Sequence, residues 1–109
     1  MGTGKQGGLS VNYTAIALRE LDEIWAWNCG RYGPSHANEY IAFFKRNIDA
    51  LALKPERGKR LELPLDARYF RIREKSRGHG HVAVYSVNEA TLTVHHVFHT
   101  AQDWQNRID

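Results

Sequence analysis

The spacing of the apolar residues changes once along this chain, and that change limits the possible folds more than any other feature. Between residues 15 and 53, apolar side chains recur every three or four positions, as they do in amphipathic helices. Between residues 68 and 99 they alternate with polar side chains, as they do in strands with one buried face. A helical segment followed by a run of strands predicts an α+β fold, with the helices packed on one face of a sheet.

The first half of the chain contains clear signals for where each helix begins and ends. Residues 9–13 can form a short first strand, and Thr14 offers a hydroxyl that can cap a helix beginning directly after it. Gly30–Pro34 contains two glycines and a proline, which stop this helix and allow the chain to reverse. A second helix is expected over residues 35–53, and Pro55 ends it because proline disfavours helical geometry in the preceding residue. Residues 56–60 are then expected to form a charged loop around Gly58. The two helices are therefore predicted to form an antiparallel hairpin.

The second half predicts three strands, near residues 68–74, 81–87 and 91–99, with a short turn between the last two. In the first of these strands, Phe70 and Ile72 form an apolar face that should pack on the helices. Its other face is basic and aromatic and carries Tyr69, Arg71 and Arg73. The expected architecture is an N-terminal strand, a helical hairpin and a small antiparallel sheet.

The composition is that of one soluble globular domain. The chain has 109 residues, of which 42% are hydrophobic and 25% are charged, values close to the globular average. Residues 1–8 are polar and rich in glycine, so a flexible tail is expected before a single domain at residues 9–109. No apolar run reaches the roughly 20 residues of a membrane span, and the N-terminus lacks the apolar stretch of a signal peptide. A cytoplasmic location is therefore expected.

Two further features describe the redox state and the charge of the chain. Cys29 is the only cysteine, so it cannot form an internal disulfide, and we interpret it as a structural residue. The formal net charge of +3 favours an acidic partner, but it does not distinguish DNA, RNA and an acidic protein.

Six short segments carry a resemblance to a known family. They are Leu21–Trp25, Tyr32–Gly33, Ala37–Tyr40, Leu51–Pro55 with Gly58, His81–Val87, and His96–Trp104. Most of these residues are core or turn residues, so no single segment is specific. Their order and spacing together, over nearly all of the chain after the tail, resemble the ParE-type toxins of the RelE/ParE superfamily.

The resemblance implies the toxin of a type II toxin–antitoxin system, held in a hetero-oligomer by a cognate antitoxin, commonly of the ribbon-helix-helix type. ParE-like members are associated with inhibition of DNA gyrase, which is the activity we expect, with nucleic acid contacted only through partners. Two alternatives stay open. RelE-like relatives on the same fold cleave mRNA in the ribosome, and a non-toxic component could tune repression by its antitoxin. Fold alone does not separate these activities.

The candidate antitoxin-binding residues belong to the predicted strands. They are Tyr69, Arg71, Arg73, Tyr85, His95 and His99. Guanidinium groups on one strand face can bind phosphate or acidic side chains, and we favour an acidic partner. A ribonuclease would need converging cations with a general acid and a general base, for which His99, Arg71 and Arg73 are the alternative set. Because no complete constellation is visible, no catalytic residue is predicted.

The remaining candidates are near the C-terminus and among the histidines. Trp104 and Arg107 are the candidate target-binding residues. Simple alternation places His95 and His99 on one side of the last strand. Closely spaced histidines are weakly diagnostic of a metal, and the chain has neither a cysteine pair nor an HExxH helix, so neither a metal nor a cofactor is expected.

Overall fold

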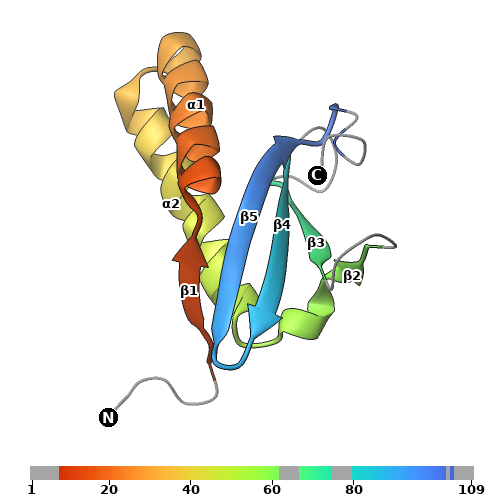
Figure 1. The fold of residues 1–109 in the computed structure, drawn as a ribbon. Helices are drawn as coiled ribbons and strands as arrows, with labels where there is room; N and C mark the ends of the chain where they lie inside the picture. Colours follow the sequence, from red (N-terminus) through yellow and green to blue (C-terminus); the bar gives the residue numbers. More distant parts are fainter. Residues whose placement is uncertain (1–7, 62–66, 75–79, 103, 105–109) are drawn as a thin grey trace.

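The computed structural model describes residues 8–61, 67–74, 80–102 and 104. Two helices lie beside one five-stranded sheet of order β1-β5-β4-β3-β2 (Figure 1). The elements are β1 (Ser10–Tyr13), α1 (Ala15–Tyr32), α2 (Pro34–Leu51), the 3-10 turn η1 (Pro55–Arg57), β2 (Lys59–Arg60), β3 (Arg68–Ile72), β4 (His81–Asn88) and β5 (Thr91–His99). The predicted α+β fold, with its N-terminal strand and helical hairpin, is confirmed.

Local chemistry fixes the ends of the helices. The backbone N–H of Ala17 donates to the Oγ1 atom of Thr14 at 3.1 Å, which satisfies one of the free amides in the first turn of α1. Gly33 ends the helix with a φ of 95°, a conformation that favours glycine. Pro34 then occupies the first position of α2, where its missing N–H costs nothing. The chain therefore reverses between two helices without a longer loop.

The sheet is mixed, which the sequence did not determine. β1 pairs with β5 in parallel, with Ser10 opposite Thr91 and Tyr13 opposite Val94. β4 pairs in antiparallel fashion with β3 on one side and with β5 on the other, as predicted. A fifth strand, β2, lies where the sequence indicated only a charged loop, and it pairs with β3 in antiparallel fashion.

The main core lies between the helical hairpin and one face of the sheet. It contains the helix residues Ala17, Leu21, Phe44, Ile48, Leu51 and Ala52, together with Ile72, Ala83, Tyr85, Leu92, Val94 and Val97 from the strands. The side chains of Phe44 and Ile48 are fully buried. Because the helices cover this face of the sheet, a partner can reach only the opposite face.

A second, smaller core covers part of the opposite face. It contains Ala67, Val82, Val84, Phe98 and Trp104, with Tyr69 and Leu61 packed against it. Trp104 is only 4% exposed, and its ring lies 4.9 Å from that of Tyr69 and stacks on Phe98. The turn that follows β5 is therefore docked on the sheet.

No helix within the described ranges is both long enough and apolar enough to cross a membrane. The predicted tail lies outside the described residues, except for Gly8.

Candidate partner-binding surface

Cations gather around aromatic rings at the β2–β3 edge of the sheet. An open hollow of about 180 Å³ is lined by Arg57, Lys59, Tyr69, Phe70 and Arg71. The guanidinium of Arg57 lies 4.9 Å from the ring centre of Phe70, and that of Arg71 lies 5.8 Å from the ring centre of Tyr69. These contacts hold exposed charges close to partly buried rings. Such a hollow can bind an acidic group and pack its apolar part at the same time.

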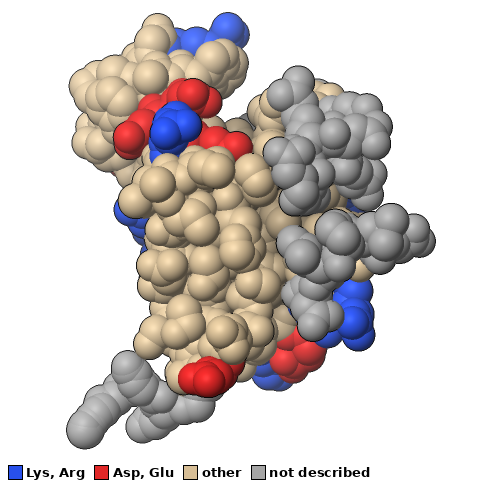
Figure 2. Space-filling view, in the orientation of Figure 1, with Lys and Arg blue, Asp and Glu red and all other residues tan. Residues whose placement is uncertain are grey.

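A second hollow, of about 250 Å³, continues this basic edge and is lined by Arg60, Ala67, Arg68, Ser86 and Val87. Arg60 and Arg68 lie directly opposite each other in the β2–β3 pairing, an arrangement of like charges that is unfavourable by itself. The Nη1 atom of Arg68 donates to the carbonyl of Gly58 at 2.6 Å, which fixes the direction of its guanidinium. Figure 2 shows Lys and Arg side chains beside acidic ones at the lower right, where η1 and β2 lie in Figure 1.

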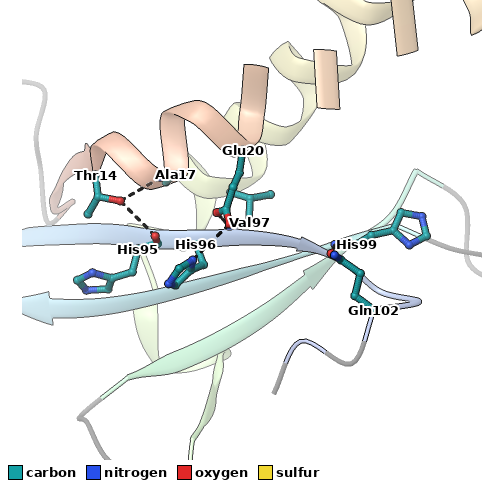
Figure 3. A network of polar contacts seen from close by, with 8 residues as sticks. All are labelled: Thr14, Ala17, Glu20, His95, His96, Val97, His99 and Gln102. Atoms are coloured by element: carbon teal, nitrogen blue, oxygen red, sulfur yellow. Dashed lines mark hydrogen bonds and ion pairs between the residues drawn. The ribbon is translucent and has the colours of Figure 1, made fainter. Parts of the chain in front are cut away.

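A β-bulge in β5 changes which histidines share a face. Val84 pairs with His96 and Tyr85 pairs with Val94, so His95 is an extra residue. The imidazoles of His95 and His96 lie on the same side of the strand, while that of His99 points away from them (Figure 3). His95 contacts the hydroxyl of Ser86 at 2.7 Å through Nε2. The expectation that His95 and His99 share one side is therefore wrong, because the extra residue at the bulge interrupts the alternation of side chains along β5.

Side chains close the part of the β5 edge that β1 does not cover. The Oε1 atom of Glu20 accepts from the backbone N–H of Val97 at 2.7 Å, and the Oγ1 of Thr14 donates to the carbonyl of His95 at 3.1 Å (Figure 3). The other carboxylate oxygen of Glu20 lies 3.3 Å from Nδ1 of His96. Glu20 of α1 and the N-cap residue Thr14 thus supply the acceptor and the donor that a longer β1 would have supplied, and they protect this edge from pairing with another chain.

We expect Glu20→Ala to lower the free energy of unfolding by about 1–3 kcal/mol, because it leaves the N–H of Val97 without its acceptor near the protein interior. Glu20→Gln keeps an acceptor oxygen and should cost clearly less. Denaturant unfolding of both variants checks this. Glu23→Ala, at an exposed position on the same helix, is the control and should leave stability within about 0.5 kcal/mol. Equal losses for Glu20→Ala and Glu23→Ala would contradict the role of this carboxylate.

The structure places the predicted antitoxin-binding residues in three different environments. Tyr69 and Arg71 lie together at the basic hollow, and Arg73 is exposed just beyond β3. His95 lies on the same face of the sheet beside Ser86. Tyr85, by contrast, is fully buried in the main core, and its hydroxyl donates to the carbonyl of Pro55. Its side chain is not on the surface, because Tyr85 lies with Ala83 on the face of β4 that the helices cover.

His99 belongs to a different group of contacts. Its ring meets that of His81 edge-on at 5.3 Å between centres, and the ring of His81 lies 5.4 Å from that of Tyr40 in α2. His99 therefore lies toward the helices, whereas Arg71 pairs with Val82 of the second core and points to the other face. The alternative catalytic set of His99, Arg71 and Arg73 is thus not gathered around one point.

The two predicted target-binding residues also differ from each other. Trp104 is buried in the second core, so its indole packs inside the molecule. Arg107 lies outside the described residues. Among the residues that the structure describes, no group of three or more His, Cys, Asp or Glu side chains is arranged to hold a metal ion.

Sequence reasoning missed the cations that complete the basic edge. Arg57, Lys59 and Arg60 were placed in a charged loop, although the density of Lys and Arg between residues 54 and 60 was a signal of a basic surface. Glu20 was not among the predicted functional residues. Nothing in the sequence indicates that its carboxylate reaches a strand 77 residues away.

Comparison with known proteins adds a family and two related folds. Residues 11–104 match the family model described as the ParE toxin of the type II toxin–antitoxin system parDE. A solved structure described as the chromosomal ParDE TA system from P. aeruginosa matches with a TM-score of 0.69 at 17% identity, covering 85% of this chain and 97% of that chain. A mutant of the E. coli toxin RelE in the free state matches with a TM-score of 0.60 at 15% identity, covering 92% of each chain. No curated protein matches the sequence.

Proposed function

Because the chain belongs to the ParE toxin family of type II toxin–antitoxin systems, we propose that it inhibits DNA gyrase and is neutralised by a cognate antitoxin. The family match over residues 11–104 is the observation that carries the proposal. It spans the hairpin, the sheet and the docked turn, so it concerns the whole domain. On this proposal the chain works by binding and not by catalysis, in the cytoplasm, and its antitoxin is of the ribbon-helix-helix type.

The basic edge supports an acidic antitoxin segment as the partner. Arg57, Lys59 and Arg71 line one hollow at the edge of the sheet together with Tyr69 and Phe70, which suits a segment that alternates carboxylates with apolar side chains. Arg60 and Arg68 lie directly opposite each other in the β2–β3 pairing, and a nearby negative charge reduces the repulsion between them. We propose that the antitoxin lays such a segment along β2 and β3 and forms a hetero-oligomer with the chain.

The arrangement of the histidines favours binding over mRNA cleavage. A general acid or base must lie within reach of the group that stabilises the phosphate. Here His99 faces the helices and Arg71 faces away from them. The RelE-like fold keeps mRNA cleavage as the alternative that an experiment must address.

The experiment compares two assays with the same purified chain. We expect it to reduce supercoiling by gyrase, or to trap cleaved DNA, and to leave mRNA on programmed ribosomes intact. His99→Ala should then change neither result beyond its effect on folding. Loss of a true general acid or base lowers a rate about 10²–10⁴-fold. Robust mRNA cleavage by the parent that collapses in folded His99→Ala would replace this proposal with a ribonuclease, and no effect in either assay would favour the non-toxic component.

A further inference from the structure

Three titratable rings meet where α2, β4 and β5 converge. The hydroxyl of Tyr40 lies 2.5 Å from Nδ1 of His81, and the ring of His81 meets that of His99 edge-on, with 5.3 Å between centres. Tyr40 is only 8% exposed, and both histidines are partly buried. The three residues come from three elements, so a change in one ring affects how the hairpin, the sheet and the end of β5 fit together.

At neutral pH the side chains of Tyr40 and His81 are both uncharged. Burial, with a smaller effect of Glu74, raises the pKa of Tyr40 to about 12. Burial, with a smaller effect of His99, lowers the pKa of His81 to about 4. We assign the neutral phenol as the donor and Nδ1 of neutral His81 as the acceptor, which is the tautomer with the imidazole proton on Nε2. Among the residues that the structure describes, the groups that face His81 are Tyr40 from α2 and His99 from β5. Glu74, after β3, acts on Tyr40, and Arg73 lies beside Gly80.

His99 connects this group to the turn that follows β5. Its Nδ1 accepts from the backbone N–H of Ala101 at 3.0 Å. Its own backbone N–H donates to Oε1 of Gln102 at 2.7 Å, and Figure 3 shows these two residues side by side. An imidazole that accepts at Nδ1 cannot carry a proton there. The hydrogen bond to Ala101 is therefore available only while His99 is neutral.

The same turn is tied to the residue before His81. Thr100 donates its backbone N–H to the carbonyl of Gly80 at 3.0 Å, and Gly80 donates its own N–H to Oγ1 of Thr100 at 3.0 Å. A side chain at Gly80 would overlap the carbonyl of Ile72, so the three segments approach closely here. Two residues beyond Gln102, Trp104 is buried in the second core.

We propose that His81 and His99 form a pH-sensitive joint that holds the C-terminal turn, and that protonation of His81 loosens the turn and releases Trp104 from the sheet. A proton on Nδ1 of His81 removes the acceptor of Tyr40 and places a positive charge against His99 in a partly buried site. The strain falls on the contacts of His99 and Thr100, which are the ones that dock the turn. This joint goes beyond the proposed function and does not depend on which target the chain inhibits.

The sign of the effect follows from the lowered pKa of His81. The open state restores a pKa near 6.5, so it binds the proton more tightly than the closed state, whose value is about 4. The docked state of the C-terminal turn therefore has its full stability above about pH 6.5 and loses stability as the pH falls toward 4. One proton taken up across this window changes the opening equilibrium roughly twentyfold between pH 7 and pH 5.

The test is an NMR titration of the full chain from pH 7.5 to pH 4.5. The readouts are the imidazole signals of His81, the indole signal of Trp104 and the hydrogen-exchange protection factor of the Ala101 amide, corrected for intrinsic exchange. We expect the protection factor to fall roughly twentyfold between pH 7 and pH 5. The Trp104 indole should shift over the same range. An unchanged protection factor, or an imidazole of His81 that titrates near 6.5 in the closed protein, would overturn the proposal.

Three variants make the test specific. His81→Asn keeps an acceptor where Nδ1 lies but cannot take up a proton, so the pH dependence should disappear. His36→Asn, at a histidine in the first turn of α2 whose ring is tilted against that of Tyr32, is the matched control and should behave as the parent. If His81→Asn does not fold, Tyr40→Phe removes only the donor and should move the transition to higher pH. A transition that persists in folded His81→Asn, or stays in place in Tyr40→Phe, would contradict the joint.

Discussion

Trp104→Ala lowers the free energy of unfolding by about 3–5 kcal/mol, the usual cost of truncating a buried tryptophan. The ring is 4% exposed and packs against Phe98 and Tyr69, and both neighbours lose contacts when it is removed. Chemical denaturation of the parent and the variant measures the difference. Because the second core holds the C-terminal turn on the sheet, we also expect increased exchange of the Ala101 amide.

Trp27→Ala is the control for this prediction. Trp27 is 58% exposed on α1, and its ring contacts Arg31 and Tyr32 at the surface. Its loss should change stability by no more than about 1 kcal/mol. Equal losses for the two tryptophans would mean that the turn is not docked in solution. If Trp104→Phe keeps the fold but abolishes inhibition of the target, Trp104 also has the target-binding role that the sequence suggested.

Arg71→Glu weakens binding of the cognate antitoxin by about 2–5 kcal/mol, which corresponds to a dissociation constant roughly 30-fold to several thousandfold higher. The change replaces a cation at the basic hollow with a carboxylate facing the acidic segment that we propose as its partner. Arg71 is exposed and does not belong to either core, so the folded state should persist. Titration calorimetry with the antitoxin that we propose as its partner measures the affinity.

Arg46→Glu provides the same change of charge at an exposed position of α2, on the hairpin. It should change the affinity by less than about threefold, because a charge outside the contact acts mainly on the association rate. A similar loss for both variants would indicate a long-range effect of net charge instead of a defined contact. An unchanged affinity for Arg71→Glu would remove the β2–β3 edge from the antitoxin-binding surface.

The sequence was sufficient for the elements whose cause is local. The cap at Thr14, the reversal at Gly33 and Pro34, and the alternation of Phe70 and Ile72 each depend on a few neighbouring residues. The spacing of apolar residues and the capping and turn residues therefore predicted the helical hairpin and the three later strands. The predicted and observed ends of these elements differ by a few residues. The order of short segments also identified the family, because that order is a property of the sequence itself.

The candidate surface was only partly predictable. The pattern of β3 places Tyr69 and Arg71 on one face, and the structure brings them together at the hollow. It does not reveal that Arg57 and Lys59 join them, because β2 is two residues long and too short to have a period. Tyr85 and His95 were grouped with them by type, yet one lies in the core and the other at a bulge.

The class of fold, the hairpin, the family and one basic strand face could all be predicted from the order of the amino acids. The tertiary structure alone decided the parallel pairing of β1 with β5, the bulge at His95, the contact of Glu20 with Val97, the burial of Trp104 and the meeting of Tyr40, His81 and His99. The physical reason is the range of the interactions. Caps, turns and alternation act between near neighbours, whereas each of the latter joins segments far apart in the chain, whose meeting depends on how the whole sheet is assembled.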